Sequence, residues 1–360
     1  MRGMSESFDA DVLVLGLGPA GASAAGIVAQ SGLRVIALDR KSQAGYPVQC
    51  AEFVPSMLGQ TVGGLTESYL QDIHAMATFL EKQDKTHTPN FRGTMVSRAI
   101  FDRVLIDKAE QAGAICWFAA SIQNIDDNGV VRLSSGEILR ARAIIGADGP
   151  KSIAGRVIGQ INRDCVETRQ ITVPLLEQHS ATDIFLSNEI VGGYGWLFPK
   201  GDQANLGLGI LPAWKAELKP LLERLHADLV VAGRVGDDVL SYTGGLIPVG
   251  GMLDPVGSFG VTPIVLAGDA AGLTNPITGA GISAAVISGD MAGKAVAAYL
   301  SGSHNALEGY REDLEDLFGA SLRRALKSRN RLLERYADGG KPDLAALKSA
   351  WIAYPEYWAA

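Results

Sequence analysis

The sequence predicts an α/β protein in which a Rossmann-type nucleotide-binding domain is joined to an antiparallel β-sheet domain and a C-terminal helical segment. Three observations lead to this prediction. A glycine-rich turn joins an apolar strand to a helix within residues 11–30, and a second such turn occurs within residues 264–300. Between them, residues 165–240 hold short strand-like runs separated by turn residues, which is typical of antiparallel sheets.

Length and composition limit the classes of protein that fit. At roughly 150 residues per domain, 360 residues indicate two domains, or one domain with a large insertion. Hydrophobic residues make up 47% of the chain and charged residues 20%, which excludes a disordered chain. The formal net charge of −7 argues against nucleic acid as a partner, because phosphate contacts need a basic surface. Three widely spaced cysteines favour a reducing compartment over a disulfide framework.

No segment has the pattern of a signal peptide or a membrane span, so we expect a cytoplasmic protein. Residues 314–335 form a helical pattern with an apolar stripe and a basic side. The ordinary interpretation is a helix packed on the core. The alternative is peripheral contact with the inner face of the membrane through this basic amphipathic helix.

The first turn has the spacing of a dinucleotide fingerprint. Residues 11–15 are a buried-strand pattern, a small-residue helix follows, and the next strand, residues 34–38, ends at Asp39. In this pattern the glycines allow a tight turn, approach of backbone to a pyrophosphate, and close helix packing, while the acid binds ribose hydroxyls. The candidate cofactor-binding residues here are Gly16, Gly18, Pro19, Ala20, Gly21, Asp39 and Arg40.

Two later strand ends favour FAD over NAD. One strand ends at Asp148-Gly149, and another ends at Gly268-Asp269, followed by Gly279, Gly281 and Ile282 at the start of an apolar helix. A simple NAD domain does not need a second glycine-rich turn 250 residues after the first. An extended FAD does, because its flavin end reaches away from the pyrophosphate. We expect Asp269 to bind ribityl hydroxyls and the following helix to direct its dipole at the flavin.

These motifs, together with Arg98-Ala-Ile-Phe-Asp102, occur in an order that resembles FAD-dependent oxidoreductases of the para-hydroxybenzoate hydroxylase-like fold. Within that group the chain most resembles the geranylgeranyl reductase family. The closer resemblance rests on Pro47-Val-Gln-Cys50-Ala51, on residues 192–201 with Tyr194-Gly-Trp196-Leu-Phe198-Pro199, and on residues 268–282. By position, the resemblance implies FAD contacts at Ala20, Asp39, Cys50, Ala51, Arg98, Ala120, Asp269, Gly281 and Ile282. Family members often have glycine after the Cys-Ala pair, whereas Glu52 and Phe53 follow here.

The resemblance also implies the domain organisation. We expect the FAD-binding domain in two parts, residues 9–164 and 241–300. The substrate-binding sheet is expected at residues 165–240 and the C-terminal helical segment at residues 301–360.

Three residues are candidates for contact with the substrate. Tyr194 and Trp196 lie two apart on an expected strand and share one face, which is either a packing face or a wall of the isoprenoid cavity that the resemblance implies. Cys50 is either a small buried hydrophobe or, given its place in the motif, a residue beside the flavin that helps to protonate a substrate carbon or shapes the pocket. No histidine or cysteine spacing suggests a metal site, and none is expected.

The resemblance implies an enzyme of lipid metabolism. In the main hypothesis, reduced FAD transfers a hydride to a C=C bond of an isoprenoid or similar apolar substrate, such as a prenyl lipid. The alternative is a flavin-dependent monooxygenase that hydroxylates an aromatic substrate, including a side chain of a partner protein. The reductant is NADPH, NADH or a ferredoxin-like donor. A carrier between a donor and a quinone is disfavoured, since three scattered cysteines cannot ligate an iron–sulfur cluster.

Overall fold

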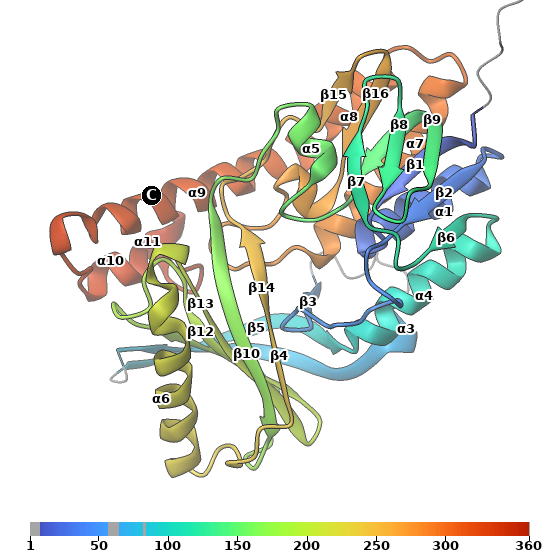
Figure 1. The fold of residues 1–360 in the computed structure, drawn as a ribbon. Coiled ribbons are helices and arrows are strands. Elements are labelled where there is room, and N and C mark those ends of the chain that lie inside the picture. Colours follow the sequence, from blue (N-terminus) through green and yellow to red (C-terminus); the bar gives the residue numbers. More distant parts are fainter. Residues whose placement is uncertain (1–7, 57–64, 82–83, 360) are drawn as a thin grey trace, which may run out of the picture.

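The computed structural model describes residues 8–56, 65–81 and 84–359, which form two eight-stranded sheets and a C-terminal helical segment (Figure 1). The predicted fold class is confirmed. The first sheet belongs to the Rossmann-type domain, and the second lies beside it (Figure 1).

In the first sheet the strand order is β15-β16-β9-β1-β2-β6, and β7 and β8 extend from β9 as an antiparallel meander. The central pairs, β1 with β2 and β9, and β9 with β16, are parallel. The strands are β1 (Ala10–Leu15), β2 (Val35–Leu38), β6 (Ile115–Trp117), β7 (Ile122–Ile125), β8 (Val130–Leu133), β9 (Ile138–Gly146), β15 (Val256–Phe259) and β16 (Thr262–Leu266).

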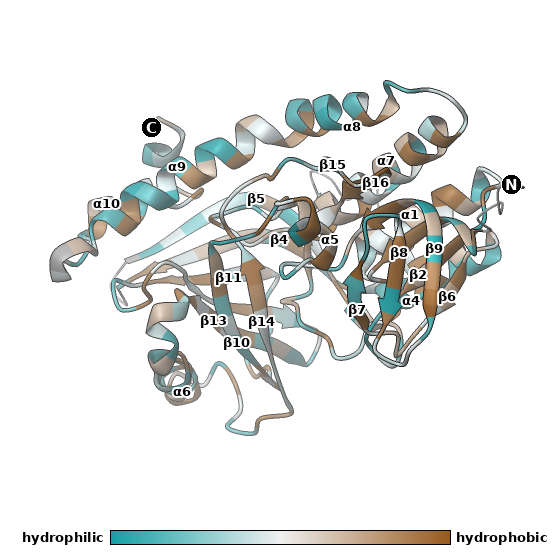
Figure 2. Ribbon diagram, turned by 45° about the horizontal axis from the view of Figure 1, so that its top comes forward, coloured by the Kyte–Doolittle hydropathy of each residue, from teal (hydrophilic) through white to brown (hydrophobic). Residues whose placement is uncertain are grey.

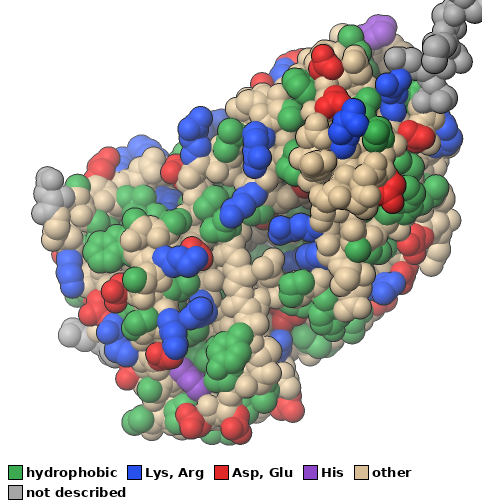
Figure 3. Space-filling model, in the orientation of Figure 1, with side chains coloured by type: hydrophobic (Ala, Val, Ile, Leu, Met, Phe, Trp, Pro, Cys, Tyr) green, Lys and Arg blue, Asp and Glu red, His purple; other side chains and the backbone are tan. Residues whose placement is uncertain are grey.

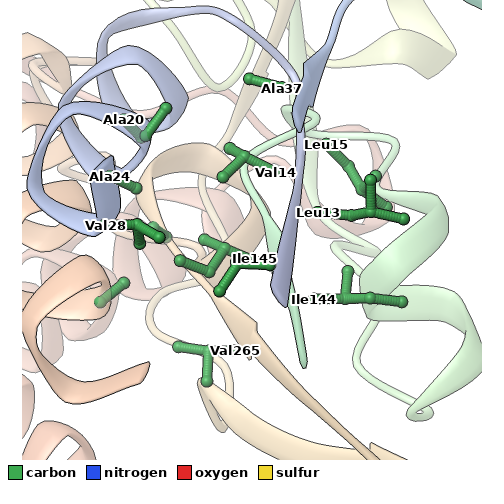
Figure 4. Packing of buried hydrophobic residues seen from close by; sticks show 14 of the residues in the cluster. Leu13, Val14, Leu15, Ala20, Ala24, Val28, Ala37, Ile144, Ile145 and Val265 are labelled. Atoms are coloured by element: carbon green, nitrogen blue, oxygen red, sulfur yellow. The ribbon is translucent and has the colours of Figure 1, made fainter. Parts of the chain in front are cut away.

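Three helices pack together beside this sheet: α1 (Pro19–Gln30), α4 (Arg98–Gln111) and α7 (Ile282–Leu300). Side chains such as Val14, Val28 and Ile145 fill the layer between sheet and helices (Figure 4). Helices α1 and α7 approach closely because both are rich in small residues. A methyl group at Gly289 of α7 would lie 2.2 Å from the carbonyl oxygen of Ala20, so glycine is required there.

The second sheet has the strand order β14-β10-β13-β12-β11-β4-β5-β3. Its pairs are antiparallel except β11 with β4. Helix α6 (Leu218–Val231), preceded by a 3₁₀ turn at Pro212–Glu217, packs on one face. The strands are β3 (Phe53–Pro55), β4 (Tyr69–Leu80), β5 (Asp84–Val96), β10 (Cys165–Pro174), β11 (Ala181–Leu186), β12 (Gly195–Lys200), β13 (Gln203–Ile210) and β14 (Ser241–Pro248).

The second sheet takes strands from outside residues 165–240. Strands β3, β4 and β5 come from the segment that we expected to belong wholly to the FAD-binding domain, and β14 comes from its expected second part. The β4–β5 hairpin was hard to predict, because β4 pairs with β5 through two register shifts and β5 contains Pro89 and Gly93.

The C-terminal segment is helical, as predicted, and runs from the first domain across to the second sheet (Figure 1). Hydrophilic and hydrophobic residues alternate along α8 and α9, so each presents an apolar side to the protein (Figure 2). The elements are α8 (Ala306–Leu314), a π-helical stretch at Glu315–Gly319, α9 (Ala320–Glu334), a 3₁₀ turn at Ala337–Gly339, α10 (Leu344–Ser349) and α11 (Pro355–Trp358). Short helices α3 (Leu65–Ser68) and α5 (Ile153–Val157) and the 3₁₀ turn at Gly268–Ala271 complete the fold.

Candidate functional site

A large cavity of about 2100 Å³ lies where the two sheets and the C-terminal segment meet. Its lining includes the turn before α1, the segment around Cys50, strands β10 and β12, and residues of the C-terminal segment; it also reaches α6. A pocket for one small ligand usually measures about 300–1,000 Å³. This cavity therefore has room for a dinucleotide and a second, elongated molecule.

The turn before α1 is shaped to receive a phosphate group. Gly18 is the N-cap of α1, and no side chain caps the free N–H groups of this helix end. A methyl group built on Gly18 meets no protein atom within 4 Å and would enter the cavity. The open space and the helix N-terminus together fit the pyrophosphate of FAD.

The end of β2 forms the next part of this cradle. The Asp39 carboxylate accepts hydrogen bonds of 2.8 Å from the backbone N–H groups of Leu17 and Lys41. These bonds fix the carboxylate at the edge of the cavity beside the α1 turn. The backbone N–H of Ala120 donates to the carbonyl of Asp39 at 2.8 Å, which brings Ala120 to the same edge.

The second turn brings a half-buried acid to the other end of the cradle. Asp269 accepts a hydrogen bond of 2.8 Å from the Thr274 hydroxyl. Burial raises the pKa of Asp269, while Thr274 and the charge of Arg98 act in the opposite direction. Helix α7 begins at Ile282, and its N-terminus faces the cavity through Gly281 and Ile282. These groups fit the polar chain and ring edge of a flavin.

Most of the predicted site residues lie together on the cavity wall. They are Gly16, Gly18, Pro19, Ala20, Asp39, Arg40, Cys50, Ala51, Arg98, Ala120, Asp148, Gly149, Tyr194, Trp196, Asp269, Gly279, Gly281 and Ile282. Gly21 and Gly268 are not on this wall. A methyl group on Gly21 would lie 1.8 Å from the Gly16 carbonyl oxygen, and one on Gly268 would lie 3.0 Å from Ala20, so both serve packing.

Asp148 lies on the cavity wall, but its carboxylate is occupied by hydrogen bonds within the protein. It accepts hydrogen bonds from the Ser152 hydroxyl at 2.5 Å and from the Ile153 N–H at 2.6 Å. Burial raises the pKa of Asp148, and these bonds oppose the rise. The carboxylate therefore caps the start of α5.

The raised pKa of Asp269 leads to a testable prediction. A carboxyl group whose folded pKa is raised stabilises the fold most below its ordinary value of 3.8, and that contribution is lost as the pH rises through the folded pKa. Ionisation of this group, once the pH exceeds its raised folded pKa, thus destabilises the flavin-free protein. We expect Asp269→Asn to raise the thermal midpoint of the flavin-free protein, by an amount that grows with pH, and to lower its FAD occupancy. A thermal advantage that shrinks with pH would contradict this interpretation.

The backbone around Cys50 is held by side chains of the second sheet. The Gln170 amide of β10 donates to the Cys50 carbonyl at 3.1 Å, and the Asn205 amide of β13 donates to the Ala51 carbonyl at 3.2 Å. The same Gln170 accepts a hydrogen bond of 2.9 Å from the indole N–H of Trp196. Gln170 thus fixes Cys50 and Trp196 relative to each other.

Glu52 anchors the same loop from a strained backbone. Its φ angle is +68°, in the left-handed region that a non-glycine residue rarely adopts. The carboxylate accepts hydrogen bonds from the Arg98 backbone N–H at 3.0 Å, the Lys200 ammonium at 2.7 Å and the Asn205 amide at 2.9 Å. Only 5% of Glu52 is exposed, so these bonds compensate the buried charge.

Arg98 places a positive charge beside Cys50. The guanidinium forms two hydrogen bonds with the Asp102 carboxylate, at 3.0 and 3.2 Å. Burial lowers the pKa of Arg98, but Asp102 and the Cys50 thiol raise it more, so the net direction is upward. The arginine therefore remains a fixed cation between Cys50 and Asp102.

An aromatic wall leads away from Cys50. Ring centroids are 5.8 Å apart between Phe53 and Phe198, 6.5 Å between Phe198 and Trp196, 5.7 Å between Trp196 and Tyr194, and 4.8 Å between Tyr194 and Trp351. All five rings line the cavity. The Tyr194 hydroxyl donates to the Thr278 carbonyl at 2.5 Å, which ties the wall to the second glycine-rich turn.

The sequence did not indicate several of these residues. Gln170 and Asn205 lie in strands without a local motif, and Trp351 and Ile352 lie between α10 and α11; these four reach the site only through the tertiary fold. Lys200 lies within residues 192–201, but nothing in that pattern indicated its ion pair with Glu52. The one signal available was the pair Glu52 and Phe53, which follow Cys50-Ala51 where the resemblance suggested glycine. Both residues prove to lie on the cavity wall.

A metal-binding cluster or a membrane-spanning helix would bear on the class of site, and the described residues contain neither. Within that part of the chain, His, Cys, Asp and Glu side chains nowhere gather into a group of three or more that suits a metal ion. Across the same residues, no helix has both the length and the apolar character needed to cross a membrane.

The chain matches two known family models, one for cofactor binding and one for the catalytic domain. Residues 9–173 match the model described as an FAD binding domain, and residues 162–240 match the model described as a geranylgeranyl reductase catalytic domain. The chain is 32% identical over 348 residues to digeranylgeranylglycerophospholipid reductase 2 of Methanopyrus kandleri, covering 88% of this chain and 85% of the relative. It is 31% identical over 281 residues to digeranylgeranylglycerophospholipid reductase 1 of Methanococcoides burtonii, covering 72% and 68%.

Solved structures show the same architecture. A geranylgeranyl bacteriochlorophyll reductase-like protein from Thermoplasma acidophilum superposes with a TM-score of 0.77 at 25% identity, covering 97% of this chain and 98% of the other. PqsL of Pseudomonas aeruginosa, a probable FAD-dependent monooxygenase, superposes with a TM-score of 0.69 at 19% identity, covering 92% and 97%. The second likeness concerns the fold alone.

Proposed function

Because the chain belongs to the geranylgeranyl reductase family of FAD-dependent oxidoreductases, we propose that it reduces C=C bonds in the prenyl chains of a lipid. FAD is the cofactor, and when bound it supplies two-electron redox chemistry. The observation that carries the proposal is the aromatic wall that extends from Phe53, beside Cys50, to Trp351. An apolar, ring-lined channel continuous with the FAD cradle suits a long unsaturated hydrocarbon.

The roles of the residues follow from their positions. Gly18, Asp39 and Asp269 would hold the phosphates and hydroxyls of FAD. Tyr194, Trp196 and Phe198 would align a prenyl chain and exclude water from it. Cys50 would donate the proton that completes saturation, with its Sγ–H directed to a substrate carbon. Gln170 holds the Cys50 backbone, and Arg98 supplies a fixed charge beside the thiol.

Reoxidation of the reduced flavin by an unsaturated lipid, measured without oxygen, tests this proposal. Protein reduced chemically with dithionite, to bypass the natural electron donor, is mixed with a digeranylgeranylglycerophospholipid in detergent. We expect the absorbance of oxidised flavin to return only when the unsaturated lipid is present. The fully saturated lipid is the matched control. If oxygen reoxidises the reduced flavin but the unsaturated lipid does not, the proposal is contradicted. The monooxygenase alternative has only the shared fold in its support.

We also propose that the protein meets anionic lipid at its periphery through α9. Lys327 and Arg331 are exposed on this helix, and Arg335 is exposed at its C-cap; none of the three forms an ion pair with any residue that the structure describes. Basic side chains gather over this part of the surface (Figure 3). Such a patch attracts acidic membrane surfaces by about 1 kcal/mol per basic residue, and salt screens the attraction.

Sedimentation with vesicles tests this contact. At low salt we expect the protein to sediment with phosphatidylglycerol-containing vesicles and not with purely phosphatidylcholine vesicles. The double variant Lys327→Glu and Arg331→Glu should lose most of that binding. Equal sedimentation of the variant would argue against α9 as the contact.

A further inference from the structure

The cavity ends at the C-terminal segment in a small cluster of polar and aromatic residues. Beyond Trp351, the lining consists of Ile352, Tyr357 and Trp358, together with Ser321 and Arg324 of α9. Trp351 and Tyr357 are buried, whereas Trp358 is 58% exposed and Arg324 is also exposed. The apolar channel therefore reaches solvent beside Arg324.

Arg324 is held in place but its charge is not neutralised. Its guanidinium carbon lies 5.4 Å from the centroid of the Trp358 ring. The Trp358 indole N–H in turn donates to the Ile352 carbonyl at 2.9 Å, which fixes the ring under the arginine. Among the described residues, no carboxylate forms an ion pair with Arg324. An arginine stacked by one face on an aromatic ring keeps its N–H edges free for another partner.

The other cations on the cavity wall either have carboxylate partners or lie away from the end of the cavity at the C-terminal segment. Arg98 binds Asp102, Lys200 binds Glu52, Lys215 binds Glu167 and Lys219 binds Glu223. Arg40, Lys41 and Lys151 lie at the FAD-binding end, and Arg169 lies on the β10 face toward α6, with Ile171. Among the described residues of the cavity wall, Arg324 is thus the cation at the open end of the aromatic channel that has no carboxylate partner.

We infer that Arg324, with Ser321 one turn away on α9, binds the phosphate of a prenyl phospholipid whose chain occupies the aromatic channel. A charged phosphate cannot enter the channel without a large desolvation cost, so it remains at the mouth while the chain goes in. Arginine's planar fork suits phosphate oxygens, and the serine hydroxyl adds a further donor. This inference rests on the proposed function and names the polar end of its substrate.

Two lipids that differ only in the phosphate test the inference. The substrates are a digeranylgeranylglycerophospholipid and the same diether alcohol without phosphate, both in neutral detergent. We expect Arg324→Gln to raise KM for the phospholipid about tenfold, the loss expected for one charge-assisted hydrogen-bonding group, with kcat unchanged. KM for the neutral lipid should not change. Arg324→Lys should restore part of the phospholipid affinity, which shows that the variants are folded.

The control is Arg323→Gln on the same helix. Arg323 is already paired with Glu315 and is not on the cavity wall, so this variant removes the same charge without touching the site. It should leave both KM values unchanged. Equal effects of Arg324→Gln on both lipids, or no effect on either, would overturn the inference.

Adding inorganic phosphate tests whether the Arg324 site binds the phosphate of a lipid or a free phosphate ion. With the neutral lipid as substrate, we expect millimolar phosphate to leave the wild-type rate unchanged. Inhibition that disappears in Arg324→Gln would show a site for free phosphate and would overturn the assignment to the lipid. Wild-type protein that turns over neither lipid would contradict the proposed function itself, and the inference with it.

Discussion

Replacing Gly18 with alanine is expected to give a folded protein that has lost its FAD. Gly18 has φ −74° and ψ −174°, angles that alanine adopts without strain, and its added methyl group meets no protein atom within 4 Å. That methyl group would occupy the space where the pyrophosphate approaches the helix N-terminus. We expect the purified variant to carry less than roughly a tenth of the wild-type flavin. The ratio of flavin to protein absorbance measures this directly.

Gly21→Ala is the matched comparison. Here the methyl group would lie 1.8 Å from the carbonyl oxygen of Gly16, so the turn itself must distort. We expect this variant to unfold at a lower temperature even without flavin, whereas flavin-free Gly18→Ala should unfold like flavin-free wild-type protein. Full flavin content in Gly18→Ala would contradict the placement of the pyrophosphate at this turn.

Cys50→Ala is expected to keep its FAD and to lose turnover. The substitution leaves in place the backbone carbonyl that Gln170 binds and removes only the thiol beside Arg98. General acid catalysis typically contributes about 10²–10⁴-fold to a rate, so we expect kcat to fall by about 10²-fold or more. Single-turnover reduction of the prenyl lipid, with flavin content measured in parallel, tests this.

Cys116→Ala provides the control for the loss of a thiol. Cys116 lies in β6, away from the cavity wall, and burial raises its pKa to about 12, so it has no place in proton transfer. This variant should turn over at the wild-type rate. If Cys50→Ala does the same, Cys50 is a packing residue and the proton comes from another group.

The sequence predicted those parts of the site that depend on short stretches of neighbouring residues. The α1 turn and the Gly268-Asp269 turn each combine a strand end with a helix start, and Asp39 directly follows the end of β2. This local geometry is set within a few residues. The same holds for Tyr194, Trp196 and Phe198, because alternation along a strand places them on one face. Structure adds that these rings continue to Trp351.

Other parts depend on contacts between distant segments and left no local pattern. Gln170 reaches Cys50 across 120 residues of chain, and Lys200 reaches Glu52 across 148. The β4–β5 hairpin joins the second sheet because β4 pairs with β11, more than 100 residues later. Asp148 matched its motif, but its carboxylate caps α5, a role that only the hydrogen-bond geometry reveals.

The central claim is that this flavoprotein adds hydrogen to a prenyl chain and does not insert oxygen. The most direct measurement is mass spectrometry of the lipid after turnover by reduced protein under an atmosphere of ¹⁸O₂. We predict that the product gains two hydrogens for each saturated double bond and contains no ¹⁸O. Incorporation of ¹⁸O into the product, with its double bonds unchanged, would contradict the claim and favour a monooxygenase.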